Sequence, residues 1–252
     1  MFRKTNTSPF KDALKCEAEG LELLRAGVAN TGCAALAVPK VISVSERELV
    51  IPHIEQRQPT PTLMSALGEG LACLHKLPQS CYGLGHDNYI GLSPQKNRWC
   101  DNWGEFFRDD RLGFQISRIQ DAKLRNEFQE VLARNSDALE GFLNEHCVRP
   151  SLLHGDLWAG NALFERTKAW LIDPAVYYGD READLAMTEF FGGFTSDFYQ
   201  AYDSVWPRTS AYAVKKDIYN LYHALNHYNL FGSGYLGQCR QLLLSLEASL
   251  NH

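Results

Sequence analysis

One short motif constrains this chain more than any other feature of its sequence. Residues 151–153 form an expected short buried strand that leads into the tripeptide His154-Gly155-Asp156, and Asn161 follows five positions after the aspartate. The apolar stretches on either side of the polar residues 165–168 predict a β-hairpin. Because a hairpin returns the chain to its starting point, we expect Asp173, directly after its second strand, to lie close to Asn161.

The spacing of these polar residues is typical of the kinase catalytic loop, in which the pattern is H-x-D-x-x-x-x-N. Phosphoryl transfer requires a carboxylate beside the attacking hydroxyl and oxygen ligands for a magnesium ion. The pattern therefore predicts that Asp156 accepts the hydroxyl proton, while Asn161 and Asp173 bind Mg²⁺. A lone HGD tripeptide is a common turn, but the succession of strand, HGD, asparagine, hairpin and aspartate is far more specific.

Composition excludes several other classes of function. The 252 residues carry a formal net charge of −5, which argues against a general nucleic-acid binder because such proteins present a basic face. No apolar run approaches the ~18 residues that span a bilayer, and the N-terminus shows no apolar leader. The seven cysteines form no C-x-x-C pair and no metal spacing. Such a pattern is typical of reduced thiols, so we expect a cytoplasmic protein.

The N-terminal region is expected to contain an amphipathic helix. Ser8-Pro9 is typical of a helix start, and the pattern predicts a helix that extends to about Arg25 and ends near Gly27. Glu17 lies on the apolar face of this helix, where a carboxylate is costly unless it is paired. The other members of that face follow helical spacing: Leu14, Ala18, Leu21 and Leu24.

The remaining patterns indicate an α+β protein with two lobes. Two short strands are expected at residues 38–44 and 48–51, and the stretch 56–62, rich in Pro and Gln, indicates a boundary. The predicted organisation is an N-terminal lobe over residues 1–56 and a larger lobe over residues 57–252. Outside the hairpin, the larger lobe is expected to be mainly helical.

Longer stretches around the motif resemble the fructosamine kinase (ketosamine-3-kinase) family. The resemblance is carried by residues 152–161 and by the run from Ile172 to Met187, which contains Asp-Pro-Ala-Val-Tyr-Tyr-Gly-Asp-Arg-Glu-Ala-Asp-Leu-Ala-Met. Shorter matches extend it over nearly the whole chain: Tyr89-Ile90-Gly91, Trp103 with Phe106-Phe107, Leu225-Asn226-His227 and Leu230-Phe231-Gly232. The resemblance implies a protein-kinase-like fold of the aminoglycoside-phosphotransferase branch.

The resemblance also implies how the N-terminal lobe binds ATP. Lys4 matches the lysine that holds the nucleotide phosphates, and Glu17 matches the helix glutamate that pairs with it. The alternative is a partly exposed surface pair. Residues 50–54 match the hinge that binds adenine through backbone groups, where Pro52 offers a carbonyl and Ile54 offers both N–H and carbonyl.

Roles for five further residues follow from the same resemblance. Trp158 is expected to stack on the sugar portion of the substrate, with a core tryptophan as the alternative. Asp180 and Arg181 are expected either to contact substrate or to form a local ion pair. Asp184 should accept hydrogen bonds from the backbone of the catalytic loop, and His154 should support the same loop.

The chain departs from the family pattern at its start. In the family, two strands and a nucleotide-covering loop precede the lysine strand, whereas the lysine here is already the fourth residue, Lys4. Either the start of this chain is internal to a longer gene product, or the protein is naturally shortened. In both cases we expect a shortened N-terminal lobe in this chain, whose lysine strand forms an exposed sheet edge. We also expect weakened binding of Mg-ATP, because the missing loop would shield the phosphates from water.

The resulting hypothesis is a kinase that uses ATP and Mg²⁺ to phosphorylate a sugar hydroxyl of a ketoamine. The substrate would be a fructosamine, ribulosamine or erythrulosamine, free or on a protein lysine, and the role would be protein deglycation. The alternatives are a truncated or inactive pseudokinase that binds nucleotide or sugar-amine, and a kinase for another amino-sugar or amino-alcohol. The intact set of Asp156, Asn161 and Asp173 disfavours the pseudokinase. No nucleic-acid or membrane partner is expected, and the oligomeric state stays open.

Overall fold

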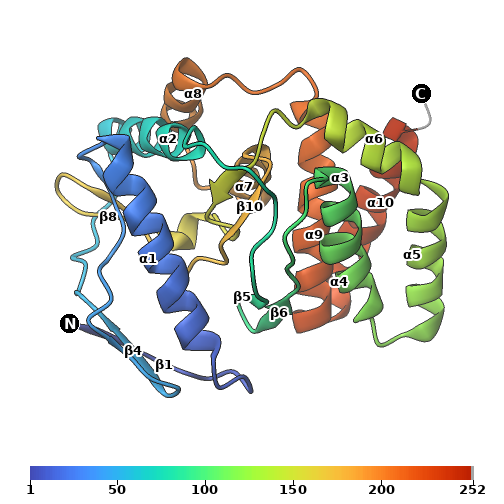
Figure 1. Cartoon of the computed structure of the whole chain (residues 1–252), viewed down its shortest axis with the longest axis horizontal. Helices are drawn as coiled ribbons and strands as arrows, with labels where there is room; N and C mark the ends of the chain where they lie inside the picture. Colours follow the sequence, from blue (N-terminus) through green and yellow to red (C-terminus); the bar gives the residue numbers. More distant parts are fainter. Residues whose placement is uncertain (251–252) are drawn as a thin grey trace.

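The computed structural model describes residues 1–250 and shows a small N-terminal sheet, a central group of short strands and a large set of helices (Figure 1). The N-terminal sheet is antiparallel with the order β1-β4-β3, formed by β1 (Phe2–Thr5), β4 (Glu48–Ile51) and β3 (Ser43–Val44). Within the described residues, β1 pairs only with β4. The strand that carries Lys4 is therefore an edge strand, as predicted.

Helix α1 (Ala13–Thr31) begins and ends later than the sequence predicts. Ser8-Pro9 is not its start, because the side chain of Asn6 accepts hydrogen bonds from the N–H and hydroxyl of Ser8 and holds these residues in a turn. The helix continues through Gly27 and ends at Gly32, whose φ of 71° is left-handed. The predicted apolar face is buried: Leu14, Ala18, Leu21 and Leu24.

The strand predicted over residues 38–44 is mostly absent. Only its last two residues are paired, as β3, against β4. Pro39 has no N–H to donate to a ladder, which explains why pairing stops before it. A different short strand, β2 (Leu36–Ala37), lies just upstream of the proline.

The predicted hairpin is confirmed. Its strands, β8 (Ala162–Phe164) and β9 (Ala169–Leu171), pair in antiparallel register. β2 adds to β9 in parallel, so a strand from the first 56 residues joins a sheet formed by the rest of the chain. This pairing ties the two predicted lobes together at the hairpin, and the boundary at residue 56 stays a prediction.

Two further strand pairs complete the centre of the molecule. β7 (Ser151–Leu153), which leads into the catalytic motif, pairs antiparallel with β10 (Tyr177–Gly179). β5 (Asn88–Ile90) pairs with β6 (Ser93–Gln95). β5 also lies beside α1 (Figure 1), so its residues face the N-terminal region.

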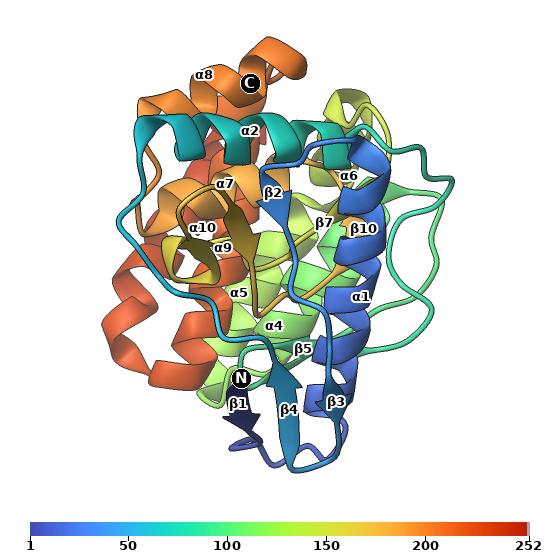
Figure 2. The ribbon, with the colours of Figure 1, turned by 90° about the vertical axis from the view of Figure 1, so that its left-hand side faces the viewer.

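Helices surround these strands on two sides. α2 (Pro61–His75) packs against α8 (Ser196–Val205) and crosses the top of the molecule in Figure 2. α7 (Glu182–Phe190) follows β10 and packs against α9. The remaining helices form a bundle on the other side in Figure 1: α3 (Trp103–Phe106), η1 (Phe107–Gly113), α4 (Phe114–Ser117), α5 (Ala122–Arg134), α6 (Ser136–His146), α9 (Tyr212–Phe231) and α10 (Leu236–Leu250). No helix within residues 1–250 is both long enough and apolar enough to cross a membrane.

Candidate active site

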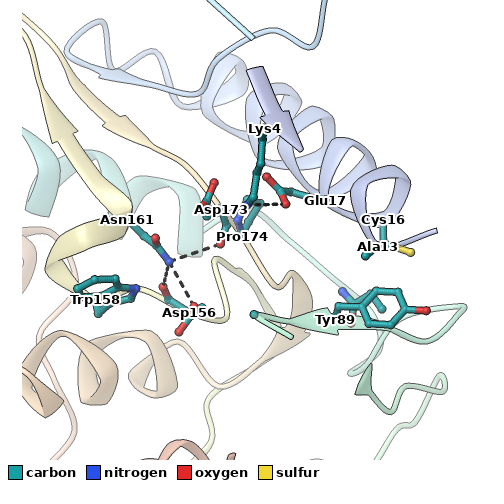
Figure 3. Close-up of a pocket in the computed structure, with 12 residues that line it drawn as sticks. Lys4, Ala13, Cys16, Glu17, Tyr89, Asp156, Trp158, Asn161, Asp173 and Pro174 are labelled. Atoms are coloured by element: carbon teal, nitrogen blue, oxygen red, sulfur yellow. Dashed lines mark hydrogen bonds and ion pairs between the residues drawn. The ribbon is translucent and has the colours of Figure 1, made fainter. Parts of the chain in front are cut away.

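Two cavities meet at Lys4 and Asp173, which line both of them. The smaller cavity, of about 210 Å³, lies between α1, β5 and the catalytic loop, and Glu17, Asp156 and Asn161 belong to its wall. The larger cavity, of about 550 Å³, lies between β1, the segment after β4 and the hairpin. Figure 3 shows the residues of the smaller cavity, with Lys4 reaching from β1 towards Glu17 and Asp173.

The catalytic loop turns sharply at Gly155. Its φ of 82° is left-handed, and a Cβ at this position would lie 2.0 Å from the carbonyl oxygen of Ala175, so only glycine fits. Asp184 of α7 accepts hydrogen bonds from the backbone N–H of His154 at 2.7 Å and of Gly155 at 2.9 Å, as the resemblance implies. Burial opposes ionisation of Asp184, but its bond to His75 and these N–H groups hold its pKa below the ordinary value.

His154 joins the catalytic loop to the strand that precedes Asp173. Its Nε2 lies 2.8 Å from the carbonyl oxygen of Ile172, and its Nδ1 accepts the N–H of Asp156 at 3.3 Å. A nitrogen facing a carbonyl must carry the proton, so the ring is the neutral Nε2–H tautomer. Burial, which lowers the pKa of His154, agrees with a neutral ring. This one side chain therefore fixes both aspartates relative to each other.

Asp156 and Asn161 are in direct contact within the loop. The Asn161 amide nitrogen donates to the Asp156 carbonyl at 2.8 Å and to its carboxylate at 3.3 Å, and it lies 3.5 Å from the carbonyl oxygen of Asp173 (Figure 3). Burial raises the pKa of Asp156 to about 7, against the effect of the Asn161 bond and with that of the Asp173 charge. A carboxylate with this pKa is well suited to accept a proton near neutral pH.

Asp173 has the only positive φ, 52°, of any non-glycine residue between positions 1 and 250. Left-handed backbone is disfavoured for residues with a side chain, and such strain clusters at functional sites. Lys4 Nζ lies 3.1 Å from the Asp173 carboxylate and 2.8 Å from that of Glu17. Burial alone would lower the pKa of Lys4, but the two carboxylates raise it, so the lysine is charged.

The pair of Lys4 and Glu17 is the one that the resemblance implies, and the apolar-face argument independently predicts a partner for Glu17. Glu17 exposes 14% of its side chain and Lys4 exposes 32%, so the pair is not a loose surface contact. Burial raises the pKa of Glu17 to about 7, and the charge of Lys4 acts in the opposite direction. The carboxylate therefore depends on Lys4 for its charged state.

The residues at the junction fit a magnesium ion by their chemistry. The amide nitrogen of Asn161 is used within the loop, so the amide oxygen is the atom that can bind a metal. Asp173 supplies a carboxylate beside it, and 42% of that side chain is exposed to the cavities. Amide and carboxylate oxygens are hard ligands of the kind that Mg²⁺ prefers, and the ion usually needs only one or two from the protein.

The predicted hinge residues Pro52 and Ile54 both line the larger cavity. Apolar side chains from three different elements face the same space: Phe2 and Ile51 from the N-terminal sheet, Leu163 from β8 and Ile172 after β9. An apolar cavity with the hinge residues in its wall is suited to a purine ring.

Trp158 lies at the wall of the smaller cavity and exposes 40% of its surface. Its ring packs over Gly160, where a Cβ would lie 2.2 Å from the indole, and makes an edge contact with Phe191. The alternative of a core tryptophan is therefore wrong. Because position 160 is a glycine, the indole can lie over the loop backbone, and it lines the same cavity as Asp156.

Asp180 and Arg181 do not reach the cavities. Asp180 is 3% exposed and contacts Lys215 and the Tyr219 hydroxyl, each at 2.7 Å. Arg181 is 2% exposed and lies 4.3 Å from the ring of Trp206. The expected substrate contact is thus wrong for both residues, because protein groups occupy their polar atoms. Nor do they pair with each other.

Sequence reasoning missed three residues at or near the site. Asn88 and Tyr89 of β5 line the smaller cavity, although Tyr89 belongs to a stretch that resembles the family. His75, the last residue of α2, binds Asp184 at 3.2 Å and Tyr202 at 2.8 Å. No local pattern marks these positions, because their importance comes from contacts with segments about eighty residues away or more.

The comparisons with known proteins agree with this geometry. The family model described as fructosamine kinase matches residues 1–249. The chain belongs to the fructosamine kinase family. A probable ketoamine kinase of Vibrio cholerae is 39% identical over 252 residues, which cover 96% of this chain and 83% of the relative. The matches do not confirm the predicted shortening of the N-terminal lobe of this family member.

Two further relatives support the family and the fold. A protein-ribulosamine 3-kinase, chloroplastic, of Oryza sativa subsp. japonica is 40% identical over 186 residues, which cover 71% of this chain and 53% of the relative. A putative fructosamine-3-kinase of Thermobifida fusca has a solved structure that superposes with a TM-score of 0.84 at 29% identity, covering 97% of this chain and 84% of the other. The fold of this family member is therefore kinase-like, with mixed helix and sheet.

Proposed function

We propose that this protein transfers the γ-phosphoryl group of ATP to a sugar hydroxyl of a ketoamine. The observation that carries the proposal is the meeting of two cavities at Lys4 and Asp173. The larger cavity, with the hinge residues along its edge, takes the nucleotide. The smaller cavity, with Asp156 in its wall, binds the sugar, so the phosphoryl group is transferred where the two cavities meet.

The chain's own residues supply most of what this reaction needs. Asp156 accepts the proton of the attacking hydroxyl, which is why it must be a carboxylate before the transfer. Lys4, held by Glu17, neutralises charge on the phosphates. Asn161 and Asp173 would hold Mg²⁺, which when bound neutralises the phosphate oxygens. His154 and Asp184 position the loop and do not contact the reacting atoms.

A ketoamine is the proposed substrate class because the relatives' names and the cavity agree. The Vibrio and Oryza relatives are named ketoamine and ribulosamine kinases. A cavity of about 210 Å³ suits a single sugar, and the exposed Trp158 ring offers it an apolar face. Because the cavity is open on one side, the amine portion extends outward, so both free ketoamines and protein-bound lysine adducts are compatible with it.

The proposed biological role is the repair of glycated amines. Phosphorylation is expected to make the adduct unstable, so that the amine is released. The proposed location is the cytoplasm, because all seven cysteines are unpaired, as is usual in a reducing compartment. The division into an ATP-binding lobe before residue 57 and a catalytic lobe after it is part of the same proposal.

The test is a coupled assay of ADP release with ribuloselysine, fructoselysine, an aminoglycoside and choline as acceptors. We expect ADP release with at least one ketoamine and a mass gain of one phosphoryl group on that ketoamine. Release with the aminoglycoside or choline alone would instead support a kinase for another amino-sugar or amino-alcohol. Binding of Mg-ATP without turnover on any acceptor would support the pseudokinase.

A further inference from the structure

Three different metal-binding side chains lie together beside the smaller cavity. Cys16 and Glu19 come from α1, and His86 comes from the loop that precedes β5. One ligand atom of each lies within 4.8 Å of the other two, and His86 Nε2 is 3.1 Å from the Glu19 carboxylate. None of the three has a role in the proposed phosphoryl transfer.

The local fold explains why these side chains converge. Cys16 and Glu19 are three residues apart on a helix, so they project from the same face. The segment of His86 is anchored to that face by its neighbour Tyr89, whose hydroxyl donates to Asp12 at 2.6 Å and whose ring lies 4.8 Å from that of Phe10. These contacts hold the two segments side by side, with the three ligand atoms within 4.8 Å of one another.

We propose that Cys16, Glu19 and His86 form a binding site for zinc or a similar borderline divalent cation. Thiolate sulfur, imidazole nitrogen and a carboxylate oxygen are the three ligand types that Zn²⁺ accepts, at about 2.0–2.3 Å from the metal. Such bond lengths place ligand atoms roughly 3.5 Å apart, so the present separations require an approach of about 1 Å. On binding, a bond forms between sulfur and metal, and the thiol proton leaves to solvent.

The electrostatic surroundings favour a cation over a free thiolate. Burial, together with the negative charges of Asp12 and Glu19, raises the pKa of Cys16 to about 11. Without metal the thiol is therefore protonated. The same negative charges attract a divalent cation, whose own charge then stabilises the thiolate.

This site differs from the magnesium site in both place and ligand chemistry. Cys16 lines the smaller cavity from the α1 side, and Figure 3 shows it away from Asp156 and Asn161. Three protein ligands leave the fourth tetrahedral position open, as in zinc sites that retain a water. A bound ion would cross-link α1, the helix that carries Glu17, to the β5 segment on the opposite wall.

Cobalt spectroscopy tests the site in the full chain, freed of metal by a chelator. With excess Mg²⁺ present, we expect one equivalent of Co²⁺ to give a sulfur-to-cobalt charge-transfer band and the strong visible bands of a tetrahedral ion. Zn²⁺ should abolish both sets of bands by competition. An octahedral spectrum without the sulfur band, or no binding, would overturn the proposal.

Substitutions test which of the three residues bind the metal ion. Cys16→Ser should remove the sulfur band, and both Glu19→Gln and His86→Gln should weaken Zn²⁺ affinity by more than about 100-fold in calorimetry, since even supporting residues cost 10–100-fold. Cys73→Ser, at another partly buried cysteine, should leave the spectrum unchanged. If Cys16→Ser fails to fold, the double variant at Glu19 and His86 replaces it, because both side chains are more than half exposed. A sulfur band that survives in either variant would contradict the assignment.

Discussion

A buried cluster of charged residues and the cluster at the cavities differ in how completely their charges are balanced. The buried cluster consists of Asp180, Arg181, Glu182 and Lys215, each at most 3% exposed. Its two carboxylates face two cations: Lys215 Nζ lies 2.7 Å from Asp180 and 2.6 Å from Glu182, and Arg181 lies 3.2 Å from Glu182. The cluster is neutral and has no access to either cavity at Lys4.

The cavity cluster consists of Lys4, Glu17, Asp156 and Asp173. Here Lys4 pairs with Glu17 and Asp173, and Asp156 lines the same cavity. Three carboxylates are thus set against one ammonium group, so two negative charges are unbalanced when all groups are ionised. Ionisation of Glu17 and Asp156 is unfavourable here, because burial raises the pKa of each carboxyl group to about 7. The comparison teaches that charge alone does not mark a site. A cluster marks a site when its excess negative charge is accessible to a ligand, because that charge favours binding of a cation and, with it, a ligand that carries phosphate groups.

The largest expected effect comes from the base of the cavity cluster. Asp156→Asn should lower kcat by about 10²–10⁴-fold, because the attacking hydroxyl then has no proton acceptor. The free energy of unfolding should not fall, because the amide relieves a buried charge and its oxygen still accepts from Asn161. ADP release and urea unfolding measure the two effects. A variant that keeps its turnover would remove Asp156 from the mechanism.

The buried cluster should respond in the opposite way. Lys215→Met leaves Asp180 and Glu182 buried without their shared partner, which we expect to lower the free energy of unfolding by about 3–5 kcal/mol. The neighbouring Lys216→Met is the control, because Lys216 is partly exposed and pairs only with Glu189. Urea unfolding compares the two variants. Equal stability would show that the buried cluster does not hold the fold.

A smaller effect is expected at the phosphate contact. Lys4→Met should raise the Kd for Mg-ATP by about 10–100-fold, which corresponds to the loss of one hydrogen bond to a charged group. Arg3→Met on the same strand is the matched control, because Arg3 is 61% exposed and pairs with Glu48 outside both cavities. Calorimetry measures both affinities. Similar losses in the two variants would indicate damage to β1 rather than loss of a phosphate contact.

A pH dependence of stability is also expected in the absence of Mg²⁺. Glu17 and Asp156 have pKa values raised to about 7 by burial, from 4.5 and 3.8. The folded chain therefore binds more protons than the unfolded chain between about pH 4 and 7, so these groups make stability fall as pH rises through that window. Urea unfolding at pH 5 and pH 8 should show this fall, and Asp156→Asn should reduce it.

Saturating Mg²⁺ supplies the control for that measurement. A bound cation favours the carboxylates, so it should weaken the fall in stability at high pH. An unchanged pH profile with Mg²⁺ would indicate that the ion does not bind beside these carboxylates.

Much of the site could be predicted because its residues follow one another in a local pattern. The strand, the turn at Gly155, the hairpin and Asp173 are encoded by one short stretch of sequence. Local preference agrees with the fold throughout this stretch except at Asp173, whose backbone is left-handed. Glu17 was reachable from periodicity alone, because a carboxylate on an apolar face requires a partner.

What could not be predicted depends on contacts between distant segments. β2 pairs in parallel with β9 across more than a hundred residues, and no local signal announces that pairing. The resemblance implied that Asp180 and Arg181 either contact substrate or form a local ion pair. Only their partners in space, such as Lys215 and Trp206, show that they are structural. The cluster of Cys16, Glu19 and His86 could not be predicted for the same reason.

The most direct test of the account is a crystal structure with Mg²⁺, a non-hydrolysable ATP analogue and a ketoamine. We predict that adenine lies in the larger cavity beside Pro52 and Ile54, that Mg²⁺ binds Asn161 and Asp173, and that the sugar lies in the smaller cavity. A sugar hydroxyl should then be within hydrogen-bond distance of Asp156, facing the terminal phosphate. A nucleotide in the smaller cavity, or a ketoamine bound away from Asp156, would contradict the claim that transfer occurs where the two cavities meet.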